Sequence, residues 1–167
     1  FPDARKFLIS PAFKFIKKYF QENNLNHLIT TGPPHLMHNV GLRLKRDIKI
    51  KWITDFRDPW SNFFQNKLLN QLESTQKKHL REEERILKNA DAVLTTAKSL
   101  NQEFSKVNNE CFYIPSGFEN TISCKPHKKF RILYAGSMRP IQNPRNLWAA
   151  LSDLIETKEN FKELVEI

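Results

Sequence analysis

Residues 48–60 read Ile48-Lys49-Ile50-Lys51-Trp52-Ile53-Thr54-Asp55-Phe56-Arg57-Asp58-Pro59-Trp60, and this stretch decides the fold. Its first half predicts a short buried strand. Asp55, Arg57 and Asp58 then crowd into the predicted turn before Pro59. Ligands of open parallel sheets bind beyond the carboxyl ends of the strands. Two carboxylates and a guanidinium at such an end are costly unless they pair or meet a ligand. Two interpretations follow: a ligand site, or an Arg57 side chain that bridges both aspartates and braces the turn.

Similar strand patterns recur along the chain. The segments with this pattern are residues 27–31, 91–96, 111–115 and 130–135. Gly32, Gly117 and Gly136 fall just after three of them. Glycine permits close approach of the backbone and positive φ angles, and proline, which is frequent at the same ends, fixes φ. Irregular backbone is therefore expected along one edge of a sheet, and we place the candidate site at that edge.

Between the predicted strands, apolar residues recur at helical spacing. We expect a helix opened by Ser10-Pro11, with Ser10 as its N-cap, and a long helix from about Asn66 to Asn89. The other predicted helices cover residues 35–46, 97–106 and 144–157. In the long helix, the side chains expected to face inward are Leu69, Leu72, Leu80 and Leu87. Alternation of strands and helices predicts an α/β fold, a Rossmann-like parallel sheet covered on both faces.

Composition fits a globular domain of 167 residues with 40% apolar content. No stretch approaches the ~18 apolar residues of a membrane span, and no signal peptide is recognised. Cys111 is expected in a buried strand and Cys124 in a linker, which suits a reducing compartment. His35 and His38 lie three residues apart, but no nearby ligand set completes a metal site, and no metal is expected.

The formal net charge is +9. The prominent basic residues are Lys14, Lys17, Lys18, Arg43, Lys45, Arg46, Lys49, Lys51, Lys77, Lys78 and Arg81. They are consistent with peripheral contact with an anionic membrane surface, and equally with a solvated helix surface. Glu82, Glu83 and Glu84 are expected to form helical ion pairs of little consequence. Nucleic acid is not expected as a partner, because aromatic residues do not interleave with the basic runs.

The two ends of the sequence indicate a fragment. The chain begins at Phe1 without methionine, and it ends within an apolar run at Ile167. We expect a first Rossmann-like domain over residues 1–118 that lacks its first strand, a polar linker over 119–129, and the beginning of a second Rossmann-like domain over 130–167.

Four motifs in this order resemble the bacterial family 4 glycosyltransferases, which are retaining enzymes of the GT-B fold. They are Thr30-Thr31-Gly32-Pro33-Pro34-His35, Asp55-Phe56-Arg57-Asp58-Pro59-Trp60, Ile114-Pro115-Ser116-Gly117-Phe118-Glu119 and Tyr134-Ala135-Gly136-Ser137. The first two resemble the branch with TTGPPH and DFRDPW motifs, and the resemblance covers nearly the whole chain. It implies an acceptor-side N-terminal domain, a C-terminal domain that binds a nucleotide-sugar, and a role in bacterial polysaccharide or cell-envelope synthesis.

The resemblance also implies roles for individual residues. Asp55, Arg57 and Asp58 would serve catalysis by orienting acceptor hydroxyls or the transferred sugar. Residues that would bind the acceptor or sugar are Thr31, Gly32, Pro33 and His35. Residues that would bind the donor are Gly136, Ser137 and Arg139, and Ser116 and Gly117 would lie at the domain crossing. From the residues alone, His35 is equally well a helix-start residue in solvent, and the loop after Gly136 an ordinary turn.

The implied partners are a nucleotide-sugar donor and a glycan or lipid-linked acceptor, in the cytoplasm or at the inner face of the plasma membrane. The nucleotide-sugar is a substrate, so no cofactor is expected. Many family members carry an arginine and a lysine where this chain has Ser137 and Gln142. That departure favours an alternative, a non-catalytic module that binds a glycan or a protein. A nucleotide-dependent oxidoreductase is disfavoured because the chain has no Gly-x-Gly-x-x-Gly turn.

Overall fold

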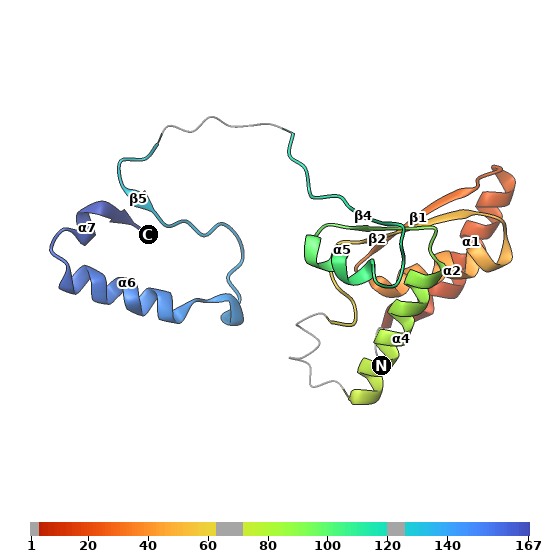
Figure 1. Cartoon of the computed structure of the whole chain (residues 1–167), viewed down its shortest axis with the longest axis horizontal. Coiled ribbons are helices and arrows are strands. Elements are labelled where there is room, and N and C mark those ends of the chain that lie inside the picture. Colours follow the sequence, from red (N-terminus) through yellow and green to blue (C-terminus); the bar gives the residue numbers. More distant parts are fainter. Residues whose placement is uncertain (1–3, 63–71, 120–125) are drawn as a thin grey trace. The chain divides into compact units, whose positions relative to one another are not determined.

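A computed structural model describes residues 4–62, 72–119 and 126–167. The chain divides into two units, Phe1–Gly117 and Phe118–Ile167, and each is described by itself (Figure 1). The predicted helix start at residues 66–71, with Leu69, and the predicted linker residue Cys124 lie outside the described residues.

The first unit is built on a four-stranded parallel sheet in the order β1-β2-β3-β4. Its strands are β1 (His27–Gly32), β2 (Lys51–Phe56), β3 (Ala92–Thr95) and β4 (Cys111–Tyr113). The register pairs Thr31 with Asp55 and Gly32 with Phe56, so β1 and β2 end side by side. The predicted α/β class with a Rossmann-like parallel sheet is confirmed. Asp55 is a strand residue, however, and its prediction as part of the following turn is wrong.

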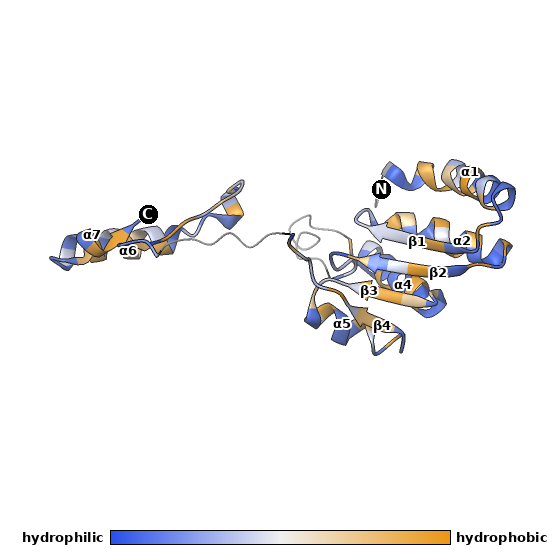
Figure 2. Ribbon diagram, turned by 90° about the horizontal axis from the view of Figure 1, so that it is seen from above, coloured by the Kyte–Doolittle hydropathy of each residue, from blue (hydrophilic) through white to orange (hydrophobic). Residues whose placement is uncertain are grey.

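Helices precede β1 and connect the successive strands that follow it. They are η1 (Ala4–Leu8), α1 (Ile9–Glu22), η2 (His35–Met37), α2 (His38–Asp47), α4 (Glu73–Asn89) and α5 (Lys98–Phe104). Figure 2 shows apolar and polar residues alternating along α1, as expected for a helix with one buried side. The N-cap of α1 is Leu8 rather than the predicted Ser10, because η1 runs directly into the helix. The hydroxyl of Ser10 instead accepts a hydrogen bond from Arg43, at 3.1 Å.

The described helices cover one face of the sheet. Alternate strand residues Trp52, Phe56 and Val93 are fully buried, together with Leu44, Ile86 and other side chains of the helices. On the opposite face Ile29 is 63% exposed, and Ile53 and Leu94 are only half-buried. Within the described residues, the prediction of a sheet covered on both faces is therefore wrong.

The side chain of Trp52 is fully buried in the core, where it contacts Thr30 on β1 and Gly41 on α2. Its indole Nε1–H donates to the hydroxyl of Thr30 on β1 at 2.9 Å. The ring lies against α2 at Gly41, where an added Cβ would meet Nε1 at 2.1 Å. A side chain at position 41 would thus displace the indole, so glycine is required for this close approach of helix and strand.

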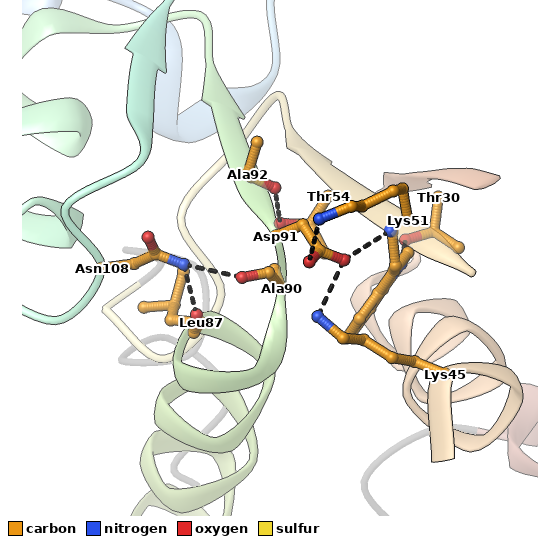
Figure 3. Close-up of polar contacts among 10 residues, drawn as sticks. Thr30, Lys45, Lys51, Thr54, Leu87, Ala90, Asp91, Ala92 and Asn108 are labelled. Carbon is orange, nitrogen blue, oxygen red and sulfur yellow. Dashed lines mark hydrogen bonds and ion pairs between the residues drawn. The ribbon is translucent and has the colours of Figure 1, made fainter. Parts of the chain in front are cut away.

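Asp91 links β2 and α2 through its carboxylate at the amino-terminal edge of the sheet (Figure 3). Its carboxylate accepts the backbone N–H of Trp52 at 2.8 Å and pairs with Lys45 at 2.7 Å and Lys51 at 3.7 Å. Burial alone would raise the pKa of this carboxyl, but the hydrogen bonds from Lys45 and Trp52 and the two lysine charges outweigh it and lower the pKa. Lys45 and Lys51 are thus committed to a structural ion pair rather than to a free basic surface.

Some sequence expectations for individual side chains are also wrong. Leu72 is 74% exposed and Leu80 is 55% exposed, whereas Leu87 is buried as predicted. Leu72 is the N-cap residue that precedes α4, so it does not belong to the helix face that packs on the core. Cys111 is half-buried rather than buried. No helix among the described residues is both long and apolar enough to cross a bilayer.

The second unit pairs two short parallel strands, β5 (Phe130–Arg131) and β6 (Val165–Glu166). Its other elements are η3 (Pro140–Gln142), α6 (Arg145–Thr157) and α7 (Phe161–Leu164). The predicted strand over residues 130–135 is shorter than expected, because backbone pairing ends near Ile132. Of the described side chains of this unit, Leu151 is buried, whereas Phe130 and Leu133 are more than two-thirds exposed.

Candidate functional site

The carboxyl ends of the four parallel strands are joined by a chain of hydrogen bonds. The carbonyl oxygen of Gly32 accepts the backbone N–H of Arg57 at 3.2 Å. The carbonyl oxygen of Arg57 accepts the hydroxyl of Thr96 at 2.9 Å, and that of Thr95 accepts the N–H of Ile114 at 2.8 Å. The tips of β1 to β4 therefore converge on one edge, which is the edge predicted to carry the site.

Asp55 and Thr31 form the polar centre of this edge. The Thr31 hydroxyl donates to Asp55 Oδ2 at 2.7 Å across the paired strands. Asp55 is half-buried, and its Oδ1 makes no hydrogen bond or ion pair with the described residues. One carboxylate oxygen is held by the protein and the other remains available, which is the arrangement that orients a hydroxyl group.

Arg57 does not bridge the two aspartates. Its Nε–H makes one long hydrogen bond of 3.4 Å to the carbonyl oxygen of Gly32, and within the described residues it forms no ion pair with Asp55 or Asp58. The guanidinium is exposed, and its two terminal nitrogens contact no acceptor in the described part of the chain. The interpretation of Arg57 as a brace between the two aspartates is therefore wrong, and most of its N–H donors have no acceptor among the described residues.

His35 and His38 lie in an aromatic cluster beneath the edge. The ring of His35 stacks on Phe56, Trp60 and His38, with centroid distances of 5.5, 5.7 and 6.0 Å. His38 is fully buried and its Nδ1 lies 2.8 Å from the Thr30 hydroxyl. His35 is only 9% exposed, so the interpretation of it as a solvent-facing helix start is wrong. Its predicted contact with a sugar is restricted to that small exposed part.

Burial keeps both imidazoles neutral. It lowers the pKa of His35 to about 4, against the opposing charge of Asp58, and the pKa of His38 to about 3. His35 Nδ1 and His38 Nε2 are buried and make no hydrogen bond in the described structure. Both nitrogens pack against Gly32, where an added Cβ would meet them at 2.4 and 2.9 Å. Gly32 is therefore required by close packing of the loop against the two rings.

Glu83 holds the turn that follows β2, and the sequence analysis missed it. It is 5% exposed on α4, and its carboxylate accepts N–H bonds from Trp60 at 3.2 Å and Ser61 at 2.9 Å. The Ser61 hydroxyl adds a third bond at 2.5 Å. Burial raises the pKa of Glu83, and these bonds oppose the shift. The prediction of ion pairs is right for Glu82 with Arg85 and Glu84 with Lys88, but wrong for Glu83. Its apolar neighbours one turn on, Ile86 and Leu87, were the available signal.

The remaining predicted residues make few contacts. Pro33, Ser116 and Gly117 are exposed, and a Cβ added at Gly117 would meet no atom within 4 Å. Gly117 lies in the same unit as Gly32 and Arg57. No contact between Gly117 and either of these residues is found in the described part of the chain. The Gly32–Pro33 and Pro33–Pro34 peptide bonds are both cis.

The predicted donor residues lie in the second unit, on an exposed loop. Gly136 has a φ of +143°, and the carbonyl oxygen of Ser137 accepts the Tyr134 hydroxyl at 3.1 Å. The backbone N–H of Arg139 donates to Gln142 Oε1 at 3.2 Å, so Gln142 caps the short η3 helix. The Arg139 side chain is exposed. Tyr134, Arg139 and Gln142 thus hold the loop in shape while leaving the Arg139 guanidinium outside it.

The described residues contain no cluster of three or more histidine, cysteine, aspartate or glutamate side chains that could hold a metal ion. The polar side chains at the strand tips are the carboxylate of Asp55, the guanidinium of Arg57 and the hydroxyl of Thr31. These groups recognise hydroxyl-rich and anionic ligands.

The chain contains an α/β domain with a Rossmann-like parallel sheet, and its candidate site lies at the carboxyl ends of the strands. A comparison with models of known protein families finds no match to the chain, and a comparison with curated proteins finds none either.

Proposed function

We propose that this chain carries the acceptor-side domain of a retaining glycosyltransferase that resembles family 4, together with part of its nucleotide-sugar domain. The observation that carries the proposal is that Asp55 and Arg57 both lie at the converging strand tips with polar atoms that no described residue contacts. One carboxylate oxygen and two guanidinium nitrogens are left without partners there in the described residues. A sugar offers hydroxyl groups to the first and a phosphorylated donor offers oxygens to the second.

In the proposed reaction, the bond between the anomeric carbon and the donor diphosphate breaks, and the acceptor hydroxyl oxygen bonds to that carbon. The hydroxyl proton passes to a phosphate oxygen of the donor, so no protein nucleophile is assigned. Asp55 and Asp58 orient hydroxyl groups, and Arg57 faces the developing negative charge. The residues proposed to bind the donor, as the resemblance implies, are Gly136, Ser137 and Arg139 of the second unit. The proposed location is the cytoplasm or the inner face of the plasma membrane.

Arg57 gives the sharpest test. In the full-length protein, Arg57→Ala should lower transfer from, or hydrolysis of, a nucleotide-sugar by about 100-fold, the typical loss of a charge-stabilising donor. Its melting temperature should stay unchanged, because the side chain makes one long hydrogen bond. Arg81→Ala is the matched control, since Arg81 is an exposed arginine on α4 with no ion pair in the described structure. Activity that falls only as far as stability falls would refute the proposal.

A non-catalytic glycan- or protein-binding module is the second candidate. Ser137 and Gln142 favour it, because Gln142 is used to cap η3 and neither residue supplies a cation for a diphosphate. A panel of common nucleotide-sugars separates the two candidates. Turnover of any donor that depends on Arg57 supports the enzyme, and saturable glycan binding without turnover supports the module.

A further inference from the structure

A cavity of about 280 Å³ opens among the helices of the first unit, away from the residues assigned to sugar transfer. It lies between η1 and α1 on one side, α2 on a second and α4 on a third. Its lining consists of Lys6, Ile9, Leu36, Asn39, Leu42, Arg43, Arg46, Lys78, Glu82 and Arg85. Ile9 and Leu42 are buried and form an apolar floor. None of the strand-tip residues discussed above lines it.

The charge of the lining is strongly one-sided. Five basic side chains meet a single carboxylate, that of Glu82. That carboxylate is already used, because its Oε2 lies 2.5 Å from Nη2 of Arg85. Arg43, Arg46 and Lys78 form no ion pair with the described residues, and Arg43 donates only to the Ser10 hydroxyl.

Several basic residues elsewhere in this unit are paired. Lys17 pairs with Asp47, Lys45 and Lys51 pair with Asp91, and the helical lysines Lys77 and Lys88 pair with Glu73 and Glu84. Others, such as Lys14 and Lys106, form no ion pair with the described residues but are exposed and do not line the cavity, whereas Arg43, Arg46 and Lys78 share it. Holding like charges close together without a counter-charge is unfavourable, and a bound anion would relieve the repulsion.

The polar wall of the cavity is preorganised to donate hydrogen bonds. Arg85 Nη2 donates to Asn39 Oδ1 at 2.7 Å, which fixes the orientation of the Asn39 amide. Asn39 is 8% exposed, and its Nδ2 makes no hydrogen bond within the described residues. The Arg85 Nε–H is likewise buried and without an acceptor in the described structure. The Asn39 amide donor thus remains unused beside Arg43, Arg46 and Lys78, whereas the Arg85 Nε–H is shielded and is not offered to a ligand.

We propose that this cavity binds a phosphate-bearing anion, with Arg43, Arg46 and Lys78 supplying the charge and Asn39 a neutral donor. The planar guanidinium of arginine can donate two hydrogen bonds to a phosphate group, and the lysine ammonium binds phosphate as a compact charge. The Asn39 amide would add a hydrogen bond of fixed direction. At about 30 Å³ for each water-sized group, the volume holds roughly nine such groups, close to the size of a diphosphate. The phosphate source is either a lipid headgroup or a soluble phosphate compound. The inference does not depend on glycosyl transfer.

The test measures binding of inorganic pyrophosphate by isothermal titration calorimetry at fixed ionic strength. The Arg46→Gln/Lys78→Gln double variant should raise Kd by at least tenfold. The matched control is Lys14→Gln/Lys106→Gln, which removes the same charge from exposed lysines with no ion pair in the described structure. The control should change Kd by less than twofold. All four side chains are exposed or at the cavity mouth, and thermal melting checks that each variant stays folded.

Two results would overturn the proposal: no saturable pyrophosphate binding by the unaltered protein, or equal losses in the two double variants, since equal losses indicate diffuse attraction by the net charge. A second arm separates the sources. Phosphatidylcholine vesicles with and without phosphatidylglycerol are sedimented with the protein. Sedimentation that requires phosphatidylglycerol, competes with pyrophosphate and is lost in Arg46→Gln/Lys78→Gln identifies a lipid headgroup. Pyrophosphate binding that is indifferent to vesicles identifies a soluble compound.

Discussion

The carboxylate of Glu83 and the hydroxyl of Ser61 lie 2.5 Å apart, and this contact ties α4 to the turn that presents Arg57 and Asp58. The same carboxylate accepts two backbone N–H groups of that turn. The burial of the Glu83 carboxylate within α4 is therefore compensated by hydrogen bonds from a turn that is distant in sequence.

Glu83→Met should destabilise the first unit by about 2 kcal/mol, because the backbone N–H groups of Trp60 and Ser61 would lose their acceptor in a buried site. Glu84→Met is the control, since Glu84 pairs with Lys88 at the exposed surface and its loss should cost about 0.5 kcal/mol or less. Urea unfolding of both variants measures the difference. Equal stability of the two would contradict the structural role assigned to Glu83.

Gly32→Ala should destabilise the protein by about 1–3 kcal/mol, the usual cost of overpacking. The new methyl group would meet His35 Nδ1 at 2.4 Å, His38 Nε2 at 2.9 Å and the His35 backbone at 3.2 Å. Gly117→Ala adds the same methyl group where no atom lies within 4 Å and should be neutral. A thermal shift that is the same in both variants would mean that the loop does not pack on the histidine rings.

Stability should fall as the pH drops below about 6.5. In the unfolded chain His35 and His38 take up protons near that pH, whereas in the folded protein their pKa values are lowered to about 4 and about 3. The unfolded state therefore binds more protons, and each histidine should cost about 2 kcal/mol between about pH 7 and pH 5. His38→Gln, which can keep a hydrogen bond to Thr30, should flatten this dependence. His27→Gln, on an exposed residue, should leave it unchanged.

Asp91→Ala should destabilise the sheet by about 2 kcal/mol, because the N–H of Trp52 loses its acceptor inside the core. Asp91→Asn keeps an acceptor and loses only the pairs with Lys45 and Lys51, so we expect a cost of about 1 kcal/mol or less. The lowered pKa of Asp91 stabilises the fold above about pH 4, and this contribution disappears as the pH falls. If both variants unfold at the same urea concentration, the ion pairs rather than the hydrogen bond carry the effect.

The strands and the edge of the sheet could be predicted because their signals are local. β1 to β4 all fall within or beside segments recognised from apolar runs ended by glycine, proline or threonine. Thr31, Gly32, Asp55 and Arg57 meet at the strand tips because parallel strands end on the same side. The sugar-transfer function and the roles of these residues stay predictions.

Side-chain environments were harder to predict where distant segments decide them. Leu80 and Leu87 lie seven residues apart in α4 and carry the same helical signal, yet Leu87 is buried in the core and Leu80 is 55% exposed. Glu83 is an acidic residue among acidic residues in the sequence, and its burial depends on Trp60 and Ser61 arriving from another segment.

By itself, the sequence determined the alternation of strands and helices, because backbone conformation and apolar periodicity depend on neighbours within a few residues. Only the tertiary structure decided that the described helices cover one face, that Arg57 bonds to Gly32 rather than to the aspartates, and that cations from α2 and α4 share a cavity. These features depend on which side chains meet across long sequence separations, and packing and charge settle that only once the elements are assembled.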